Sequence, residues 1–271
     1  MKAAAFEYAR PASLGEALEL LGEATDAKVL AGGQTLAPLL NLRLAQPALL
    51  VDITRIAELA EVAETADGLD LGAIITHAAI EDGRVPDPTS GFLAGIAAGI
   101  GYRAIRTRGT IGGSLAHADP AADWLTCLTA LGAELLLAGP GGRRRMALSG
   151  FVRGALATAL DANELIVSIR LPKFSRRARF GFHKICRKAG EFAEAIAAVV
   201  HDPERGVYRY ATSTPAGGPL LIEASQAPLA AGGTRSELQR RLTAAGFAGD
   251  AYETRLRAVA LERALKATAA A

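Results

Sequence analysis

The sequence predicts a mixed α+β fold in two lobes, followed by a smaller α+β domain. Short apolar stretches typical of strands alternate with longer stretches whose apolar residues recur at helical spacing. Half of the 271 residues are hydrophobic, many of them alanine, which favours a sizeable core with closely packed helices. A basic, polar segment at 173–179 marks an expected domain boundary. We therefore expect domains at 1–173 and 174–271, the first with lobes of about 1–55 and 56–173.

Capping residues and periodicity predict the elements of the first hundred residues. Ser13 and Glu16 have the spacing of a capping box, which predicts a helix at 11–21. Pro38 fits the first turn of a second helix. Apolar runs predict strands at 27–31, 49–53 and 69–75, and helical spacing predicts helices at 36–44 and 91–100.

The same patterns continue through the rest of the chain. The segment 119–123 should open a helix whose apolar face holds Trp124, Leu125, Leu128 and Leu131. We expect strands at 133–138, 164–172, 179–185 and 208–212, and helices at 236–245 and 250–267. Because of its alanines, 191–200 is either helical or extended. The basic run 143–145 follows two glycines and is either a solvated turn or an anion site.

Composition excludes several classes of function. The formal net charge of +2 predicts no nucleic-acid footprint. Cys127 and Cys186 lack metal or cluster spacing, so two buried free thiols in a reducing compartment are expected. Charge near the N-terminus argues against a signal peptide, and no apolar run approaches the roughly 20 residues of a membrane span, so a cytoplasmic location is expected. The four histidines, His77, His117, His183 and His201, are expected to be surface or hydrogen-bonded core residues.

Two glycine-rich segments carry the strongest functional signal. They are 31–35, Ala-Gly-Gly-Gln-Thr, and 110–114, Thr-Ile-Gly-Gly-Ser, and each is expected to be a loop that follows a strand. A glycine pair lets backbone N–H groups approach an anion because no Cβ stands in the way. Two such loops would hold the two phosphates of one dinucleotide. Neither segment matches the Rossmann or Walker pattern, and no serine sits in a nucleophile elbow.

Both segments, with their surroundings, resemble the FAD-binding medium subunits of molybdenum hydroxylases, the carbon monoxide dehydrogenase and xanthine dehydrogenase group. The most specific stretch is 106–120, Arg-Thr-Arg-Gly-Thr-Ile-Gly-Gly-Ser-Leu-Ala-His-Ala-Asp-Pro. Further similarity lies at 6–11, 28–36, 41–44, 50–53, 164–166, 184–193 and 252–256, so it covers nearly the whole chain. The resemblance implies a two-lobed FAD-binding domain of the vanillyl-alcohol-oxidase-like type and a smaller α+β C-terminal domain.

The resemblance also implies where FAD would bind. The two glycine segments would wrap the pyrophosphate and the adjoining ribityl groups, mostly through backbone N–H donors. Asp123 would accept a hydrogen bond from a ribose or ribityl hydroxyl, or else it caps the helix that follows. The complete expected set is Lys28, Leu30, Ala31, Gly32, Gly33, Gln34, Thr35, Leu36, Thr110, Ile111, Gly112, Gly113, Ser114, Ala118, Asp119, Asp123, Ile166, Lys184 and Phe192.

The remaining side chains each have two interpretations. Ile166 would line the adenine or flavin pocket. Lys184 would approach the flavin or its phosphates, or it is a solvated strand lysine. Phe192 would stack on the isoalloxazine ring or gate it, or it is a core aromatic. His117 is expected to orient the second segment, and no residue is expected to be catalytic or to bind metal. The segment 212–219 lacks the family's glycine-rich, arginine-ending pattern, and Glu191 stands where aspartate is usual.

By the same resemblance, the chain would be the flavin subunit of an electron-transfer complex. A large partner would hold the molybdenum cofactor, and a small partner would hold [2Fe–2S] clusters, in a dimer of heterotrimers. Electrons would pass from the nearer cluster through this subunit to NAD, a quinone or oxygen. One alternative is a self-sufficient flavin-dependent oxidoreductase of the same superfamily, and another is a binding protein that has lost its flavin. The sequence does not identify the substrate.

Overall fold

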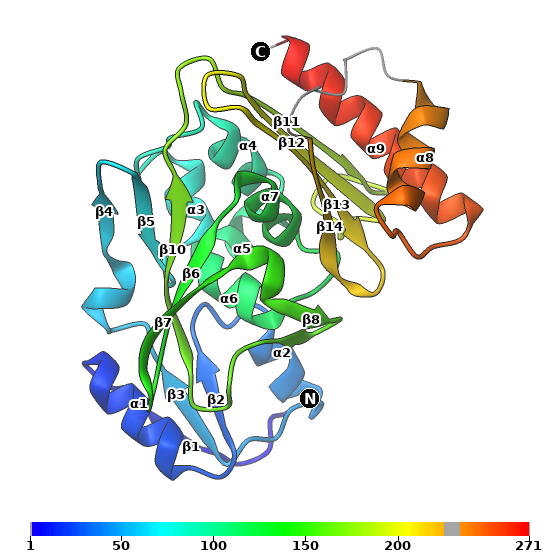
Figure 1. Ribbon diagram of the computed structural model, residues 1–271. Coiled ribbons are helices and arrows are strands. Elements are labelled where there is room, and N and C mark those ends of the chain that lie inside the picture. Colours follow the sequence, from blue (N-terminus) through cyan, green and yellow to red (C-terminus); the bar gives the residue numbers. More distant parts are fainter. Residues whose placement is uncertain (1, 225–233, 271) are drawn as a thin grey trace.

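The N-terminal part of the computed structural model, which describes residues 2–224 and 234–270, is a small parallel sheet with two helices (Figure 1). Its strands are β1 (Glu7–Ala9), β2 (Ala27–Leu30) and β3 (Leu49–Asp52), in the order β1-β3-β2. Helix α1 (Leu14–Glu23) packs its apolar face on Val51 and Ile53. Its predicted start is confirmed, because the Ser13 hydroxyl accepts a hydrogen bond from the Glu16 N–H.

Helix α2 (Leu36–Asn41) ends three residues before its predicted end at residue 44. Arg43 adopts a positive φ of 57°. A left-handed residue cannot continue a right-handed helix, so the chain turns here. The Leu44 N–H then donates to the Leu39 carbonyl, which closes the helix end.

A five-stranded antiparallel sheet forms the middle of the molecule. Its order is β4 (Val62–Glu64), β5 (Gly68–Gly72), β10 (Leu165–Pro172), β6 (Glu134–Gly139) and β7 (Gly142–Ala147). The basic run 143–145 lies in β7, so the expected solvated turn is wrong. Arg143 and Arg144 face Glu58 and Glu164. An exposed edge strand accommodates such charges, which discourage pairing with another chain.

Five helices lie between β5 and β6: α3 (His77–Glu81), α4 (Phe92–Ala98), α5 (Arg103–Arg108), α6 (Ile111–His117) and α7 (Asp123–Leu131). All nine residues of α7 are buried. The sequence predicted α4 and α7 but not α3, α5 or α6. The remaining short elements are the 3-10 helices η1 (Ala57–Ala60) and η2 (Leu148–Gly150) and the two paired strands β8 (Val152–Gly154) and β9 (Ala157–Thr158).

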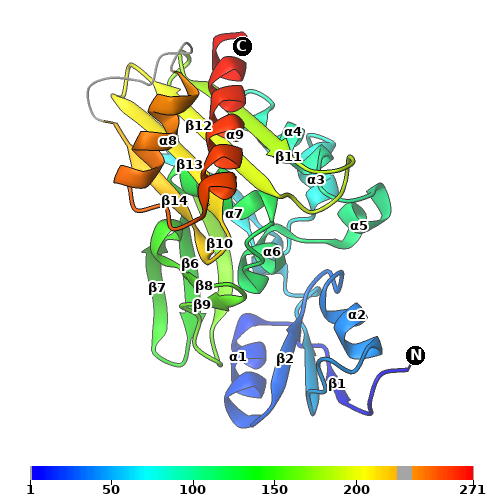
Figure 2. The same ribbon diagram turned by 90° about the vertical axis from the view of Figure 1, so that its right-hand side faces the viewer.

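A four-stranded antiparallel sheet follows, in the order β11 (Arg179–Ile185), β12 (Ala195–Asp202), β13 (Val207–Thr214) and β14 (Gly217–Glu223). Helices α8 (Arg235–Ala244) and α9 (Ala251–Ala270) cover one face, and α7 packs on the other (Figure 2). The ambiguous alanine-rich stretch is therefore extended from Ala195. In β12, Ala197 and Val199 face α8 and α9, whereas Ala198 and Val200 join the core around α7, as a strand buried on both faces requires.

The main hydrophobic core crosses the expected boundary at 173/174. It contains Leu125 of α7, Ile169 of β10 and Val200 of β12. The predicted domain limits therefore stay a proposal. The atypical segment 212–219 noted in the sequence forms the end of β13, the turn after it and the start of β14.

Among the described residues, no helix is long and apolar enough to cross a membrane, and the cytoplasmic location stays a prediction. Cys127 is buried, as expected, and its burial raises the pKa of the thiol. Cys186 is only half-buried, so the expectation of two buried thiols is wrong for this residue.

Candidate functional site

The first glycine segment is a loop that joins β2 to α2 at the carboxyl edge of the parallel sheet (Figure 1). Gly33 has a φ of 73°, a conformation that residues with a Cβ rarely adopt. Within the described part of the chain, the backbone N–H groups of residues 32–36 donate to no protein acceptor. Five consecutive unpaired donors are a backbone arrangement that suits an anion.

The second glycine segment is not a loop but the first turn of α6, so this expectation is wrong. Thr110 is the N-cap residue, and its hydroxyl accepts from the Gly113 N–H at 3.1 Å. The N–H groups of Ile111 and Gly112 donate to the carbonyls of Ile75 and Ala73. Because the Ser114 N–H also donates to the Thr110 carbonyl, all four backbone donors of 111–114 already have protein partners.

The structure brings the two segments together by close backbone packing. A Cβ built on Gly32 would lie 2.1 Å from the carbonyl oxygen of Arg108 and 2.9 Å from the Cα of Gly109. A Cβ on Gly113 would lie 3.9 Å from the Cβ of Ala31. The small N-terminal lobe therefore meets the rest of the molecule at these glycines, with α6 above the parallel sheet (Figure 2).

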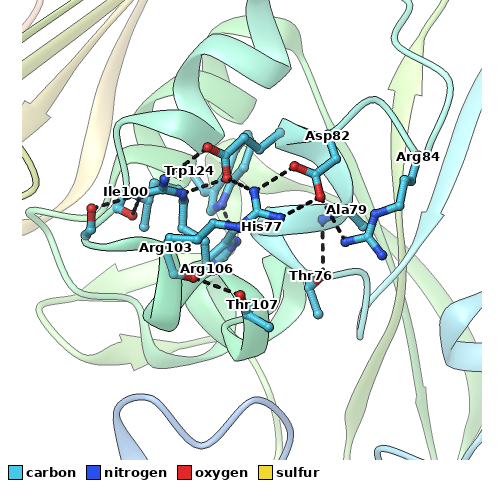
Figure 3. A network of polar contacts seen from close by, with 12 residues as sticks. Thr76, His77, Ala79, Asp82, Arg84, Ile100, Arg103, Arg106, Thr107 and Trp124 are labelled. Atoms are coloured by element: carbon cyan, nitrogen blue, oxygen red, sulfur yellow. Dashed lines mark hydrogen bonds and ion pairs between the residues drawn. The ribbon is translucent and has the colours of Figure 1, made fainter.

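An arginine network fixes α5, which leads into the second segment (Figure 3). Arg106 donates to both carboxylate oxygens of Glu81, at 2.7 and 3.0 Å, and these bonds lower the pKa of Glu81. Its other nitrogen donates to the carbonyls of Ile100 and Gly101. Arg103 adds hydrogen bonds to Glu81 and Asp82. This network was not predicted from the sequence, because its partners come from separate helices.

His77 holds the turn before α6 from the other side (Figure 3). His77 is 5% exposed, and its backbone N–H donates to the Gly109 carbonyl. Its ring Nδ1 accepts a hydrogen bond from the Trp124 indole N–H at 3.1 Å. Burial, aided by the positive charge of Arg106, lowers the pKa of His77 to about 4. The ring is therefore neutral near pH 7, and His77 is the hydrogen-bonded core histidine that was expected.

Asp123 and Lys184, both expected site residues, form a buried ion pair. Their Oδ2 and Nζ atoms lie 2.9 Å apart, and the side chains are 7% and 10% exposed. Burial raises the pKa of Asp123, and the charge of Lys184 opposes this shift. Both alternatives are therefore wrong: Lys184 is not solvated, and the N-cap of α7 is Ala122, with no side-chain cap.

One oxygen of this pair has no partner. Asp123 Oδ1 is buried and accepts no hydrogen bond from any described residue. A buried carboxylate oxygen normally has a donor, since leaving it bare costs about 1–3 kcal/mol. The Asp123 carboxylate thus keeps an acceptor position that no described residue satisfies.

The other expected residues occupy varied environments. Ile166 is 5% exposed and packs in the main core. Asp119 accepts from the Ala121 N–H at 2.9 Å and shapes the turn before α7. Phe192 is 72% exposed, so the interpretation as a core aromatic is wrong. Lys28 is exposed on β2, Leu30 is half-buried, Ala118 is the buried left-handed end of α6, and His117 is half-buried at the last turn of α6.

Two cavities lie away from the glycine segments. A cavity of about 550 Å³ is lined by residues of the β6–β7 turn and by Asp161, Asn163 and Glu164. A second, of about 400 Å³, is lined by Arg187, Glu191, Phe192 and Glu194. No cluster of potential metal ligands occurs among the described residues. A ligand held along a surface loop by unpaired N–H donors needs no enclosed cavity.

Known proteins resemble this chain over most of its length. The family model for the FAD binding domain in molybdopterin dehydrogenase matches residues 4–174. Caffeine dehydrogenase subunit beta of Pseudomonas sp. (strain CBB1) is 38% identical over 213 residues, 78% of this chain and 72% of that protein. The carbon monoxide dehydrogenase medium chain of Hydrogenophaga pseudoflava is 40% identical over 196 residues, 72% of this chain and 68% of that protein.

Solved structures also resemble this chain. A structure of carbon monoxide dehydrogenase from Hydrogenophaga pseudoflava, lacking the Mo-pyranopterin moiety of its cofactor, matches with a TM-score of 0.86 at 35% identity. The match covers 100% of this chain and 99% of that one. Quinoline 2-oxidoreductase from Pseudomonas putida 86 matches with a TM-score of 0.83 at 29% identity, over 100% and 99% of the two chains.

Proposed function

Because the chain belongs to the family of FAD-binding medium subunits of molybdenum hydroxylases, we propose that it carries electrons from the [2Fe–2S] clusters of a small partner subunit to an external acceptor. The expected family, fold class and FAD cofactor are confirmed by the matching family model and the solved structures. The relatives are subunits of dehydrogenases, so the chain is an oxidoreductase subunit.

The run of unpaired N–H groups at 32–36 is the observation that carries the proposed binding mode. These donors would bind the FAD pyrophosphate without any side chain, and the positive φ of Gly33 shapes the loop for this. The second segment would act mainly by supporting the loop, through the packing of Gly32 on Arg108 and Gly109. When bound, FAD supplies the redox chemistry, and the protein supplies binding and orientation.

Asp123 would accept a hydrogen bond from a ribose or ribityl hydroxyl at its unpaired Oδ1. The Lys184 ammonium group, buried beside the other oxygen, would hold this carboxylate in place and oppose the rise in its pKa that burial causes. A charged acceptor makes a stronger hydrogen bond than a neutral one, about 1.5–3 kcal/mol. The remaining expected contacts of FAD stay proposals of the same kind.

Partner subunits would carry the other redox centres. Two cysteines are too few to ligate a [2Fe–2S] cluster through four thiolates, which supports placing the clusters on a small partner. A large partner would hold the molybdenum cofactor and oxidise the substrate, and the complex would be a dimer of heterotrimers. The relatives named as medium chains support this division.

Reduction of the full chain by its partner tests the proposal. We expect the purified protein to retain FAD, and its flavin absorbance to bleach when a reduced small partner is added, with organic substrate alone as the control. Turnover of an organic substrate by the isolated chain would instead support the self-sufficient flavoenzyme. A chain that binds no FAD on titration would support the protein that has lost its flavin.

A further inference from the structure

Two large exposed aromatic side chains lie on loops that touch each other. Tyr102, just before α5, is 63% exposed, and Phe192, between β11 and β12, is 72% exposed. A Cβ built on Gly190 would lie 3.0 Å from the carbonyl oxygen of Gly101. Single exposed apolar residues are common, but two large ones beside a backbone contact suggest a shared ligand.

These loops adjoin the buried Asp123–Lys184 pair. Lys184 Nζ, which binds Asp123, also lies 3.4 Å from the Gly99 carbonyl oxygen. From the other side, Arg106 donates to the carbonyls of Ile100 and Gly101 (Figure 3). The backbone at 99–101 is therefore held by two cations, so the position of Tyr102 is set by the same residues that order the proposed cofactor site.

We propose that Tyr102 is a second aromatic contact of the FAD isoalloxazine ring, beside Phe192. This inference rests on the proposed function. A planar heteroaromatic ring gains from stacked or edge contacts with aromatic side chains, and exposed aromatics on fixed loops lose little entropy when they make such contacts. The ring would thereby extend from the Asp123–Lys184 pair toward solvent, where an acceptor reaches it.

Flavin fluorescence separates Tyr102 from Phe192. A phenol in contact with an isoalloxazine ring quenches its emission by electron transfer, whereas a benzene ring quenches far less. We therefore expect Tyr102→Phe to raise the emission of bound FAD several-fold with an unchanged Kd, and Phe192→Tyr to lower it. Tyr102→Ala should weaken FAD binding about 2- to 10-fold, as loss of one aromatic contact implies.

Tyr252→Ala is the matched control, because Tyr252 is 65% exposed on α9 and lies in another part of the fold. It should change neither Kd nor emission. If the wild-type chain binds FAD and the Tyr102 variants match it in both measurements, this inference is wrong and the proposed function stands. If the wild-type chain fails to bind FAD, both this inference and the proposed function are wrong.

Discussion

The two glycine segments look alike in the sequence but differ in the structure. In the first, the N–H groups of 32–36 have no acceptor within the described part of the chain. In the second, the N–H groups of 111–114 all bond to protein oxygens. Gly33 is needed for its positive φ, whereas Gly112 is needed because a Cβ there would lie 2.6 Å from the Ala73 carbonyl oxygen.

The difference shows that one motif type serves two physical purposes. The first segment keeps its donors free, which suits ligand binding. In the second segment the N–H groups bond to protein oxygens, and the two glycines leave room for close backbone contact. Helix α6 therefore packs on the turn after β5. Substitutions should therefore affect FAD binding in one segment and folding in the other.

The largest expected effect is loss of folding in Gly112→Val. The valine side chain would meet the backbone of Ala73, which cannot move away as a flexible side chain does. We expect the apo protein to lose more than about 3 kcal/mol of unfolding free energy, at the upper end for overpacking. Denaturant unfolding of the apo chain measures this.

Gly95→Ala in α4 is the control, since a Cβ at Gly95 meets nothing within 4 Å. It should be neutral or stabilising by up to about 1 kcal/mol. A Gly112→Val protein with wild-type stability would remove the packing explanation for the second segment.

Lys184→Met should come next, because it leaves Asp123 buried without its cation. Removing one partner of a buried ion pair costs about 3–5 kcal/mol. Asp123→Leu combined with Lys184→Met should recover much of this loss, since no buried charge remains. Thermal unfolding of the single and double variants tests the coupling, and equal losses in both would contradict it.

Because His77 is buried against the turn before α6, the unfolding free energy should fall at acid pH. Its folded pKa of about 4 lies below the ordinary value of 6.5, so the unfolded chain binds a proton that the folded chain does not. The contribution of this pKa difference to the unfolding free energy is complete above pH 6.5. It is lost as the pH falls toward 4, by about 3 kcal/mol in all. The difference in unfolding free energy between wild type and His77→Gln, measured across this range, should shrink accordingly. A constant difference would refute the assignment.

Gly33→Ala should act chiefly on the cofactor. A Cβ there meets only Leu30 Cδ1, at 3.3 Å, so the direct cost is the left-handed backbone, about 1–2 kcal/mol. If the loop relaxes and one charge-assisted bond to the diphosphate is lost, FAD should bind about 10- to 100-fold more weakly. Calorimetric titration measures the Kd. Unchanged FAD binding would show that the diphosphate lies elsewhere.

The smallest expected effect concerns the helix cap. Thr110→Val removes the hydroxyl that accepts from the Gly113 N–H and should cost about 1 kcal/mol. Ser13→Ala, the matched change at the cap of α1, should cost a similar amount. Chemical denaturation compares them. If Thr110→Val loses much more bound FAD than its loss of unfolding free energy explains, the second segment contacts FAD directly.

Local signals allowed much of the fold to be predicted. The start of α1 follows from Ser13 and Glu16, and β10 follows from its apolar run. The strand β7 was missed because arginines on an exposed edge follow strand pairing rather than propensity. Helix α6 was missed because glycine disfavours helices, whereas tertiary bonds to Ala73 and Ile75 help to stabilise this one.

The candidate site was predictable mainly through resemblance. Asp123 and Lys184 were expected near one cofactor, and the structure pairs them. Their direct ion pair was not expected, because it joins an α-helix to a strand distant in the sequence. The bonds of Arg106 to Glu81 were likewise invisible, since no local spacing links α3 with α5.

Hydrogen exchange of the backbone amides, with and without FAD, tests the central claim most directly. At short exchange times, which report local opening, FAD should slow exchange at residues 32–36 and leave 111–114 nearly unchanged, because the latter are already bonded to protein. Protection confined to 111–114, with 32–36 exchanging as in the apo protein, would contradict the account.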